Sequence, residues 1–82
     1  MVSFDIKLKL INIIYLNKNK TIYYLSKKSN TSYCYTLKII EELINEGIVI
    51  KIYKTKSYKI NLTKKGDRIS ELFSKILEEF II

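Results

Sequence analysis

The sequence predicts an α+β fold in which three short helices precede a two-stranded β-hairpin and a fourth helix closes the chain. Apolar residues recur at helical spacing in four segments, and a glycine follows the third of them. Between the third and fourth segments, two runs rich in isoleucine, valine and tyrosine flank a polar stretch, which is typical of a hairpin. The chain has 82 residues, so we expect 1–82 to form a single domain.

The first segment, "SFDIKLKLINIIYLNKNK", carries two different patterns. From Phe4 to Leu10, apolar and polar residues alternate, which is typical of a strand. The run "LINIIYL" that follows is almost entirely apolar and suits a helix buried on more than one side. Ser3 or Asp5 would cap such a helix, and "NKNK" would end it. We therefore favour a helix over about 4–17 and keep a strand as the alternative.

Two more helices follow with a very short connection between them. Thr21 is a suitable N-cap for a helix over about 21–29. The next helix is expected over about 32–46, with Gly47 just beyond its end in the left-handed conformation. Because only "SN" or "SNT" separates the two helices, the pair is predicted to form a tight helix-turn-helix unit.

The third helix is predicted to have one buried and one exposed face. If Ile40 marks the centre of the buried face, a rotation of about 100° per residue places the other side chains. The buried side would then hold Tyr33, Thr36, Leu37, Leu43 and Ile44, with Ile39 at its edge. The opposite side would hold Thr31, Tyr35, Lys38 and Glu42, with Cys34 near the border.

A hairpin and a last helix complete the predicted fold. The hairpin is expected over about 48–62, with the arms "IVIKIY" and "YKINL" on either side of a polar turn. Thr63 would cap a helix over about 64–80 that carries a wide apolar stripe. The expected architecture is therefore a winged helix-turn-helix: a three-helix core, a two-stranded β-hairpin wing and a C-terminal dimerisation helix.

Lysine dominates the charge of the chain. Fifteen Lys and Arg residues against eight Asp and Glu residues give a net charge of +7. This balance favours a polyanionic partner, nucleic acid before an anionic membrane surface, although a lysine-rich genome is an alternative explanation. The distribution is more informative, because residues 17–40 and 47–66 contain eleven lysines and no acidic residue.

The composition argues against an enzyme and against a metal or cofactor. The chain has no histidine and no glycine-rich phosphate loop, and its single cysteine, Cys34, cannot form an internal disulfide. We favour a half-buried structural role for Cys34 over a redox role.

Neither a signal peptide nor an apolar run of about 20 residues is visible, so we expect no membrane partner. A cytoplasmic location is expected (the host cytoplasm for a viral protein), and no small-molecule ligand is evident.

Three stretches, "LSKKSNTSYCYTLKIIEELINEGIV", the hairpin and "YKINLTKKGDRISELF", together resemble winged helix-turn-helix transcriptional regulators of the MarR/PadR-like kind. The small versions found in archaea and their viruses are especially similar. Leu25-Ser26 stands where the family has Leu-Ala, and Ser32 stands where Ser or Thr opens the third helix. The family's Leu-x-x-x-Gly-hydrophobic motif is matched by Leu43, Gly47 and Ile48. Its Y-x-L-T-x-x-G motif is matched by Tyr58, Leu62, Thr63 and Gly66, with one extra residue between the tyrosine and the leucine. The resemblance covers roughly 20–75, but lysines replace the arginine that the family often has in the wing.

The resemblance implies a sequence-specific double-stranded DNA-binding protein, a transcriptional regulator whose third helix enters the major groove and whose wing lies on the backbone or in the minor groove. At the start of the third helix we expect DNA contacts from Thr31, Ser32, Tyr35 and Lys38. Phosphate or minor-groove contacts are expected from Lys27, Lys28, Tyr53, Lys54 and Lys56. A stacking platform for single strands, made of Tyr23, Tyr24 and Tyr33, is less favoured because helical phase places Tyr33 in the core.

The first and last helices are very apolar for a chain of this length, which predicts a homodimer. The expected interface comprises Ile6, Leu10, Ile13 and Ile14 together with Phe73, Ile76, Leu77 and Phe80. Alternatively, these side chains pack only on each other within one subunit. Two alternative functions remain open: a winged helix that binds protein, and a nonspecific DNA-coating protein.

Overall fold

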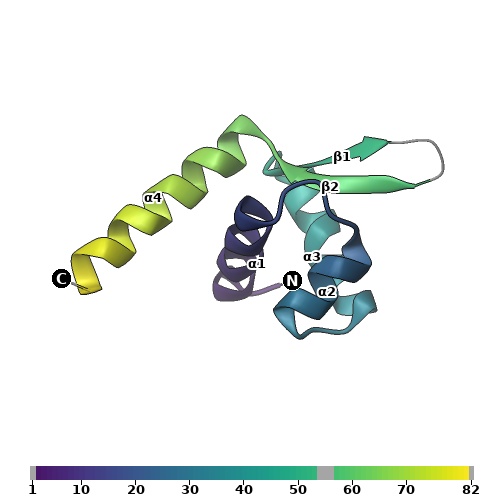
Figure 1. The fold of residues 1–82 in the computed structure, drawn as a ribbon, viewed down its shortest axis with the longest axis horizontal. Coiled ribbons are helices and arrows are strands. Elements are labelled where there is room, and N and C mark those ends of the chain that lie inside the picture. The colour runs from purple at the N-terminus through teal and green to yellow at the C-terminus, as the bar shows by residue number, and fades with distance from the viewer. Residues whose placement is uncertain (1, 54–56, 82) are drawn as a thin grey trace.

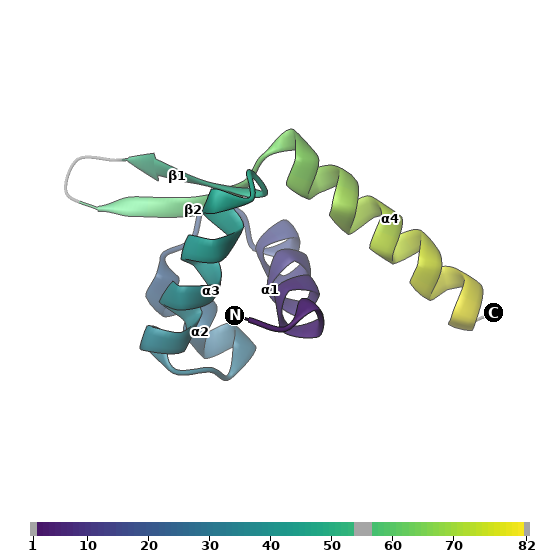
Figure 2. The ribbon, with the colours of Figure 1, turned by 180° about the vertical axis from the view of Figure 1, so that it is seen from behind.

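The computed structural model describes residues 2–53 and 57–81 of the chain. The elements follow in the order α1 (Phe4–Leu16), α2 (Ile22–Ser29), α3 (Tyr33–Asn45), β1 (Val49–Tyr53), β2 (Tyr58–Leu62) and α4 (Lys64–Ile81). The first three helices pack together, while the hairpin and α4 project in opposite directions (Figure 1). Figure 2 shows the same arrangement from behind, with α3 leading upward into the hairpin. The predicted winged helix-turn-helix class is confirmed, and the first segment is a helix.

Side-chain caps begin the first three helices. The hydroxyl groups of Ser3, Thr21 and Ser32 each accept a hydrogen bond from the backbone N–H three residues further on. Each of these bonds satisfies an amide that the helix itself leaves without a partner. The cap at Ser32 fixes the first residue of α3 and so determines which side chains that turn presents.

A Schellman turn ends α3. Gly47 has φ of 74°, its amide donates to the Ile44 carbonyl, and the Ile48 amide donates to the Leu43 carbonyl, both at 3.0 Å. This pair of bonds defines the motif and confirms the predicted role of the glycine. Because β1 begins two residues later, no flexible linker separates the wing from α3.

The hydrophobic core lies between the three helices and the base of the hairpin. Its most deeply buried apolar side chains are Leu10, Ile14, Leu25, Ile40, Leu43 and Ile60. Leu10 and Ile14 are only 1% and 0% exposed within a single chain. Their predicted place in a dimer interface is therefore corrected: both belong to the subunit's own core, because α1 already packs against α2, α4 and β2 of the same chain.

The wing is anchored at its base by a third backbone segment. β1 and β2 pair antiparallel, with Val49 opposite Leu62 and Tyr53 opposite Tyr58. The Ile60 amide also donates to the carbonyl of Lys20, in the α1–α2 connection, at 2.8 Å. Since residues directly opposite share a face, the wing face that covers the core continues outward through Lys51, Tyr53 and Tyr58.

The start of α4 is packed tightly against the end of α3. The Thr63 hydroxyl accepts from the Gly66 amide at 3.2 Å and donates to the Gly47 carbonyl at 2.7 Å, which confirms Thr63 as the cap. Gly66 is buried, and a Cβ at this position would overlap the Ile48 carbonyl oxygen and lie 3.0 Å from Leu62 Cβ. The absence of a side chain at Gly66 therefore lets the first turn of α4 approach the Ile48 backbone and the Leu62 side chain closely.

Gly66→Ala is expected to lower the free energy of unfolding by about 1–3 kcal/mol, because the added methyl group cannot be accommodated. Alanine has a higher helix propensity than glycine, by about 1 kcal/mol, and this difference alone would stabilise the variant. A loss of stability would therefore have to come from the steric overlap. Urea unfolding followed by circular dichroism measures the change. Glu71→Ala, on the exposed side of the same helix, is the control and should shift stability by less than about 0.5 kcal/mol. A stabilised Gly66→Ala variant would contradict the packing described here.

Candidate nucleic-acid interface

The first turn of α3 faces solvent. Ser32, Cys34 and Lys38 are exposed, and Thr31 is half-buried beside them. The expectation of a half-buried Cys34 was wrong, because the buried face of α3 is centred nearer to Ile39, which is 2% exposed. The turn offers small polar side chains, a thiol and one ammonium group to a partner.

Tyr33 also differs from its predicted position. Helical phase placed it in the core, yet 48% of the residue is exposed. The buried side of α3 is rotated from Ile40 toward Thr36 and Ile39, so Tyr33 lies at the margin of the packed face rather than within it. Its ring instead borders the gap between α2 and the wing.

Tyr35 lies on the opposite flank of α3 from Tyr33. It is 36% exposed and borders a shallow depression that also involves Ile6 and Lys9 of α1. The Lys9 ammonium donates to the Ser29 carbonyl at 3.3 Å, beside the α2–α3 turn. The DNA contact expected of Tyr35 therefore stays a prediction, with its ring at the α1 edge of the exposed turn.

Lysine side chains at the end of α2 lie over aromatic rings. The Lys27 ammonium is 5.2 Å from the centre of the Tyr23 ring, and the Lys28 ammonium is 5.9 Å from that of Tyr24. Both lysines are exposed. The rings hold the ammonium groups along the first turn of α2 while leaving them accessible to an anion.

The wing contributes a second basic and aromatic group. Tyr53 is 73% exposed, and its ring centre lies 5.7 Å from that of Tyr58. The Lys51 ammonium is 4.6 Å from the Tyr58 ring centre. Sequence reasoning named Tyr53 but missed Lys51 and Tyr58. The predicted contacts of Lys54 and Lys56 lie outside the described residues.

A hollow separates the wing from the helix-turn-helix unit, and we call it the tyrosine hollow. Its lining consists of Thr21, Ile22, Tyr23, Tyr33, Ser57 and Tyr58. These residues come from the start of α2, the start of α3 and the wing. The sequence analysis grouped Tyr23 and Tyr33 as part of a less favoured stacking platform, but it did not show that the wing residues Ser57 and Tyr58 lie beside them.

Two carboxylates of α3 are turned toward α1. The Lys7 ammonium lies 3.2 Å from Glu42 Oε1 and 2.9 Å from Glu46 Oε2. The hydrogen bond to Glu46, reinforced by Glu42 and opposed by burial, raises the pKa of Lys7 above its ordinary value. Burial alone would raise the pKa of Glu42, but hydrogen bonds from Lys7 and the Val2 amide, with the Lys7 charge, hold it below its ordinary value. Lys7 and Glu42 therefore stay charged and paired at neutral pH.

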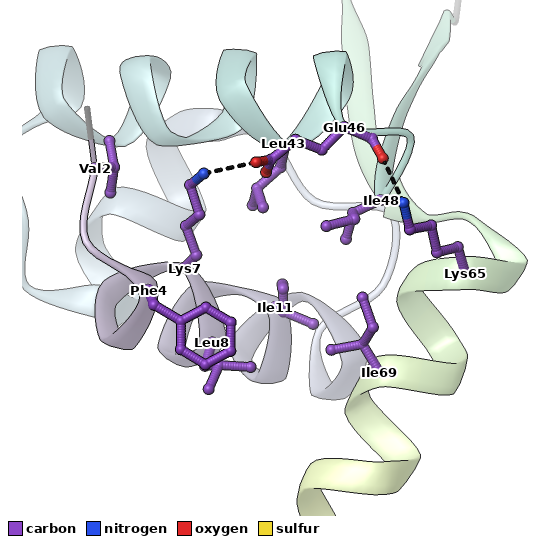
Figure 3. Close-up of a pocket in the computed structure, with 10 residues that line it drawn as sticks. All are labelled: Val2, Phe4, Lys7, Leu8, Ile11, Leu43, Glu46, Ile48, Lys65 and Ile69. Atoms are coloured by element: carbon purple, nitrogen blue, oxygen red, sulfur yellow. Dashed lines mark hydrogen bonds and ion pairs between the residues drawn. The ribbon is translucent and has the colours of Figure 1, made fainter.

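A mostly apolar cavity of about 430 Å³ lies between α1, the end of α3 and the start of α4. Figure 3 shows Phe4, Leu8 and Ile11 on one side of it and Ile69 on another. At its edge, the Lys65 ammonium donates to the Glu46 carbonyl at 3.0 Å (Figure 3). No pattern in the sequence indicates this cavity.

The apolar stripe of α4 is only partly covered. Ile69 and Phe73 are half-buried, and Phe73 lies near Ile13 of α1. The remaining stripe is exposed at Leu72 (53%), Ile76 (54%), Leu77 (41%) and Phe80 (85%). In Figure 1 this half of α4 extends beyond the packed helices. The predicted interface residues Ile76, Leu77 and Phe80 are thus accessible to another chain, and Ile6 and Ile13 are half-buried.

Over residues 2–53 and 57–81, no helix is both long and apolar enough to cross a bilayer. Within the same ranges, no cluster of three or more acidic or cysteine side chains is arranged to hold a metal ion.

No protein-family model matches the sequence, and no curated protein matches it. Solved structures match the fold. FabT of Streptococcus pneumoniae, in complex with DNA, superposes with a TM-score of 0.88 at 18% identity, over 98% of this chain and 57% of FabT. The multiple antibiotic-resistance repressor MarR of Listeria monocytogenes gives 0.74 at 24% identity, over 92% of this chain and 57% of MarR.

The protein AF1382 of Archaeoglobus fulgidus is nearer in length. It gives a TM-score of 0.80 at 24% identity, over 96% of this chain and 91% of AF1382. By contrast, the chain spans less than two thirds of FabT and of MarR. The likeness establishes a MarR-like winged-helix fold, as the sequence motifs predicted.

Proposed function

We propose that this chain, which has a MarR-like winged-helix fold, is a sequence-specific double-stranded DNA-binding protein and a transcriptional regulator that acts as a homodimer. In this proposal α3 enters the major groove and the wing follows the backbone or the adjacent minor groove. Two-fold symmetry would present two copies of α3 to a pseudo-palindromic site, roughly 34 Å apart.

One observation carries the proposal: the exposed first turn of α3 lies between two basic surfaces that contain no acidic residue. Lys27 and Lys28 flank it on α2, and Lys51 lies on the wing. All of these residues belong to the acid-free ranges 17–40 and 47–66. A polyanion that approaches α3 therefore meets positive charge on both sides. The fold that FabT uses in its complex with DNA supports the same placement.

The roles that we assign to individual side chains follow from their positions. Lys38, exposed on α3, would reach a guanine O6 or N7 or a phosphate, and Tyr35 a phosphate or a thymine methyl group. Ser32 and Thr31 are small enough to let the helix approach the base edges closely. Lys27 would position the duplex through phosphate contacts that carry no sequence information, and Lys28 and Tyr53 are assigned the same role. Lys54 and Lys56, which lie outside the described residues, are assigned this role from the sequence alone.

The exposed half of the α4 stripe supports the homodimer. Ile76 and Phe80 lie on the same side of α4 as Phe73, but beyond the contact with α1. A soluble chain that leaves such a row of large apolar side chains open normally covers it with a partner. We assign a second copy to this surface, with Ile6 and Ile13 at the margin of the interface.

Selection of bound sequences from random duplexes tests the assignment of reading and positioning residues. We expect the wild-type protein to select a two-fold related site. Lys38→Ala and Tyr35→Ala should relax the preference at defined base pairs, because they remove contacts to base edges. Lys27→Ala should weaken all duplexes about equally and reduce the salt slope by about 1.

Each alternative function has its own outcome in this experiment. A nonspecific coating protein would show only the salt-dependent, sequence-independent binding. A winged helix that binds protein would show no duplex binding at all. Identical behaviour of Lys38→Ala and Lys27→Ala would contradict the division between reading and positioning residues.

A further inference from the structure

The tyrosine hollow brings together three aromatic rings from three separate elements. Tyr23 comes from α2, Tyr33 from α3 and Tyr58 from β2, around a cavity of about 320 Å³. Tyr23 and Tyr33 are 61% and 48% exposed, so their rings and hydroxyl groups are accessible to a ligand. None of the duplex contacts predicted from the sequence involves these three side chains; Tyr23 and Tyr33 were considered only for a less favoured single-strand platform.

Two ammonium groups lie at the rim of the tyrosine hollow. Lys27 lies over the Tyr23 ring at 5.2 Å, and Lys51 lies over the Tyr58 ring at 4.6 Å. Every residue that lines the hollow belongs to the ranges 17–40 and 47–66, which contain no Asp or Glu. The hollow thus combines apolar ring faces, hydroxyl donors and positive charge. This chemistry suits a ligand that has both an anionic group and a compact carbon ring.

The position of the tyrosine hollow identifies such a ligand. A single sugar–phosphate strand separates the major groove of a duplex from the adjacent minor groove. If α3 lies in the major groove and the wing in the next minor groove, that strand must cross the space between α3 and the wing. The tyrosine hollow occupies this space, since α2, α3 and the wing all line it.

Building on the proposed function, we infer that the tyrosine hollow binds the sugar–phosphate backbone of the DNA strand that passes between α3 and the wing. A deoxyribose packs against the rings of Tyr23 and Tyr33. The phosphate oxygens accept hydrogen bonds from the tyrosine hydroxyl groups and from the ammonium groups of Lys27 and Lys51. This contact fixes the register of the duplex relative to both α3 and the wing.

The hydroxyl groups are tested by the double variant Tyr23→Phe/Tyr33→Phe. We expect its affinity for a selected duplex, measured by fluorescence anisotropy, to fall by about tenfold or more, because two hydrogen bonds to a charged group are lost. Base preference and the salt slope should not change, since no base contact and no charge is removed. The matched control is Tyr15→Phe, because Tyr15 of α1 also lies under a lysine, Lys18 at 5.4 Å, but outside the hollow.

A scan with neutral phosphates tests the ligand itself. Single methylphosphonates are placed in turn along the duplex, and the affinities of wild type and Lys51→Ala are compared. In wild type, one position in each half-site should weaken binding several-fold. In Lys51→Ala the same substitution should weaken binding by a clearly smaller factor than in wild type, because the contact between that phosphate and Lys51 is already absent.

The results separate failure of this inference from failure of the proposed function. If the wild-type protein binds no duplex, the proposed function fails and this inference with it. If wild type selects a site but the double phenylalanine variant binds it equally well, or no phosphate couples to Lys51, only the inference is overturned. Variants that weaken binding to single-stranded oligo(dT) more than to the duplex would place an unpaired base in the hollow, and would also overturn it. Unchanged thermal unfolding of the variants shows that their folds are intact.

Discussion

Ile76→Lys is expected to convert the proposed dimer into a monomer and to lower the affinity for a two-fold related duplex by at least about 100-fold. Ile76 is 54% exposed on α4, so a lysine there leaves the fold of one subunit intact but would bury a charge in the proposed interface. A monomer would bind only one half-site, so the gain in affinity that comes from linking two binding subunits would be lost. Sedimentation equilibrium measures the mass, and fluorescence anisotropy measures the affinity.

The control for this experiment is Glu78→Gln. It changes the net charge by the same +1 but lies on the exposed polar side of α4. Added positive charge favours DNA binding, so a loss of affinity in Ile76→Lys cannot arise from repulsion of the duplex. A variant that remains a dimer with wild-type affinity would show that α4 is not the interface.

Ile40→Ala is expected to lower the free energy of unfolding by about 2–5 kcal/mol. Ile40 is 0% exposed at the centre of α3, where its removal leaves a cavity between α3 and its neighbours. Ile50→Ala is the matched control, because Ile50 is 49% exposed on the outer face of the wing. Its cost should stay below about 1 kcal/mol, in line with other surface substitutions. Urea unfolding measures both changes, and equal costs would show that the buried face of α3 is wrongly assigned.

Elements with local signals could be predicted from the sequence. The caps at Thr21, Ser32 and Thr63 and the glycine at Gly47 depend on hydrogen bonds within a few residues, and each is found as expected. Such signals fix where a helix begins and ends whatever packs around it. This is why the order of elements and the winged-helix class could be inferred.

Positions that depend on distant partners could not be predicted in the same way. Helical phase placed Tyr33 in the core, because the sequence does not show that neighbouring elements cover the Thr36 and Ile39 side of α3 more fully than the Tyr33 side. The apolar run in α1 was assigned partly to a dimer, because periodicity cannot tell a covering segment of the same chain from a second copy. Leu10 and Ile14 are in fact covered by other segments of the same chain. The Lys20–Ile60 bridge and the tyrosine hollow join residues far apart in sequence and left no local pattern.

The Schellman turn at Gly47 has a consequence for how the protein meets a duplex. Only three residues separate α3 from β1, and the Ile60 amide secures the hairpin from the other side. The spacing between α3, the helix that we propose reads the major groove, and the wing is therefore fixed by the chain itself. If α3 and the wing enter neighbouring grooves as proposed, a binding site whose groove spacing does not match must itself bend or change width. The energy of this deformation depends on the base-pair steps of the site. Stiff and pliable DNA sequences would then be distinguished even at base pairs that no side chain touches.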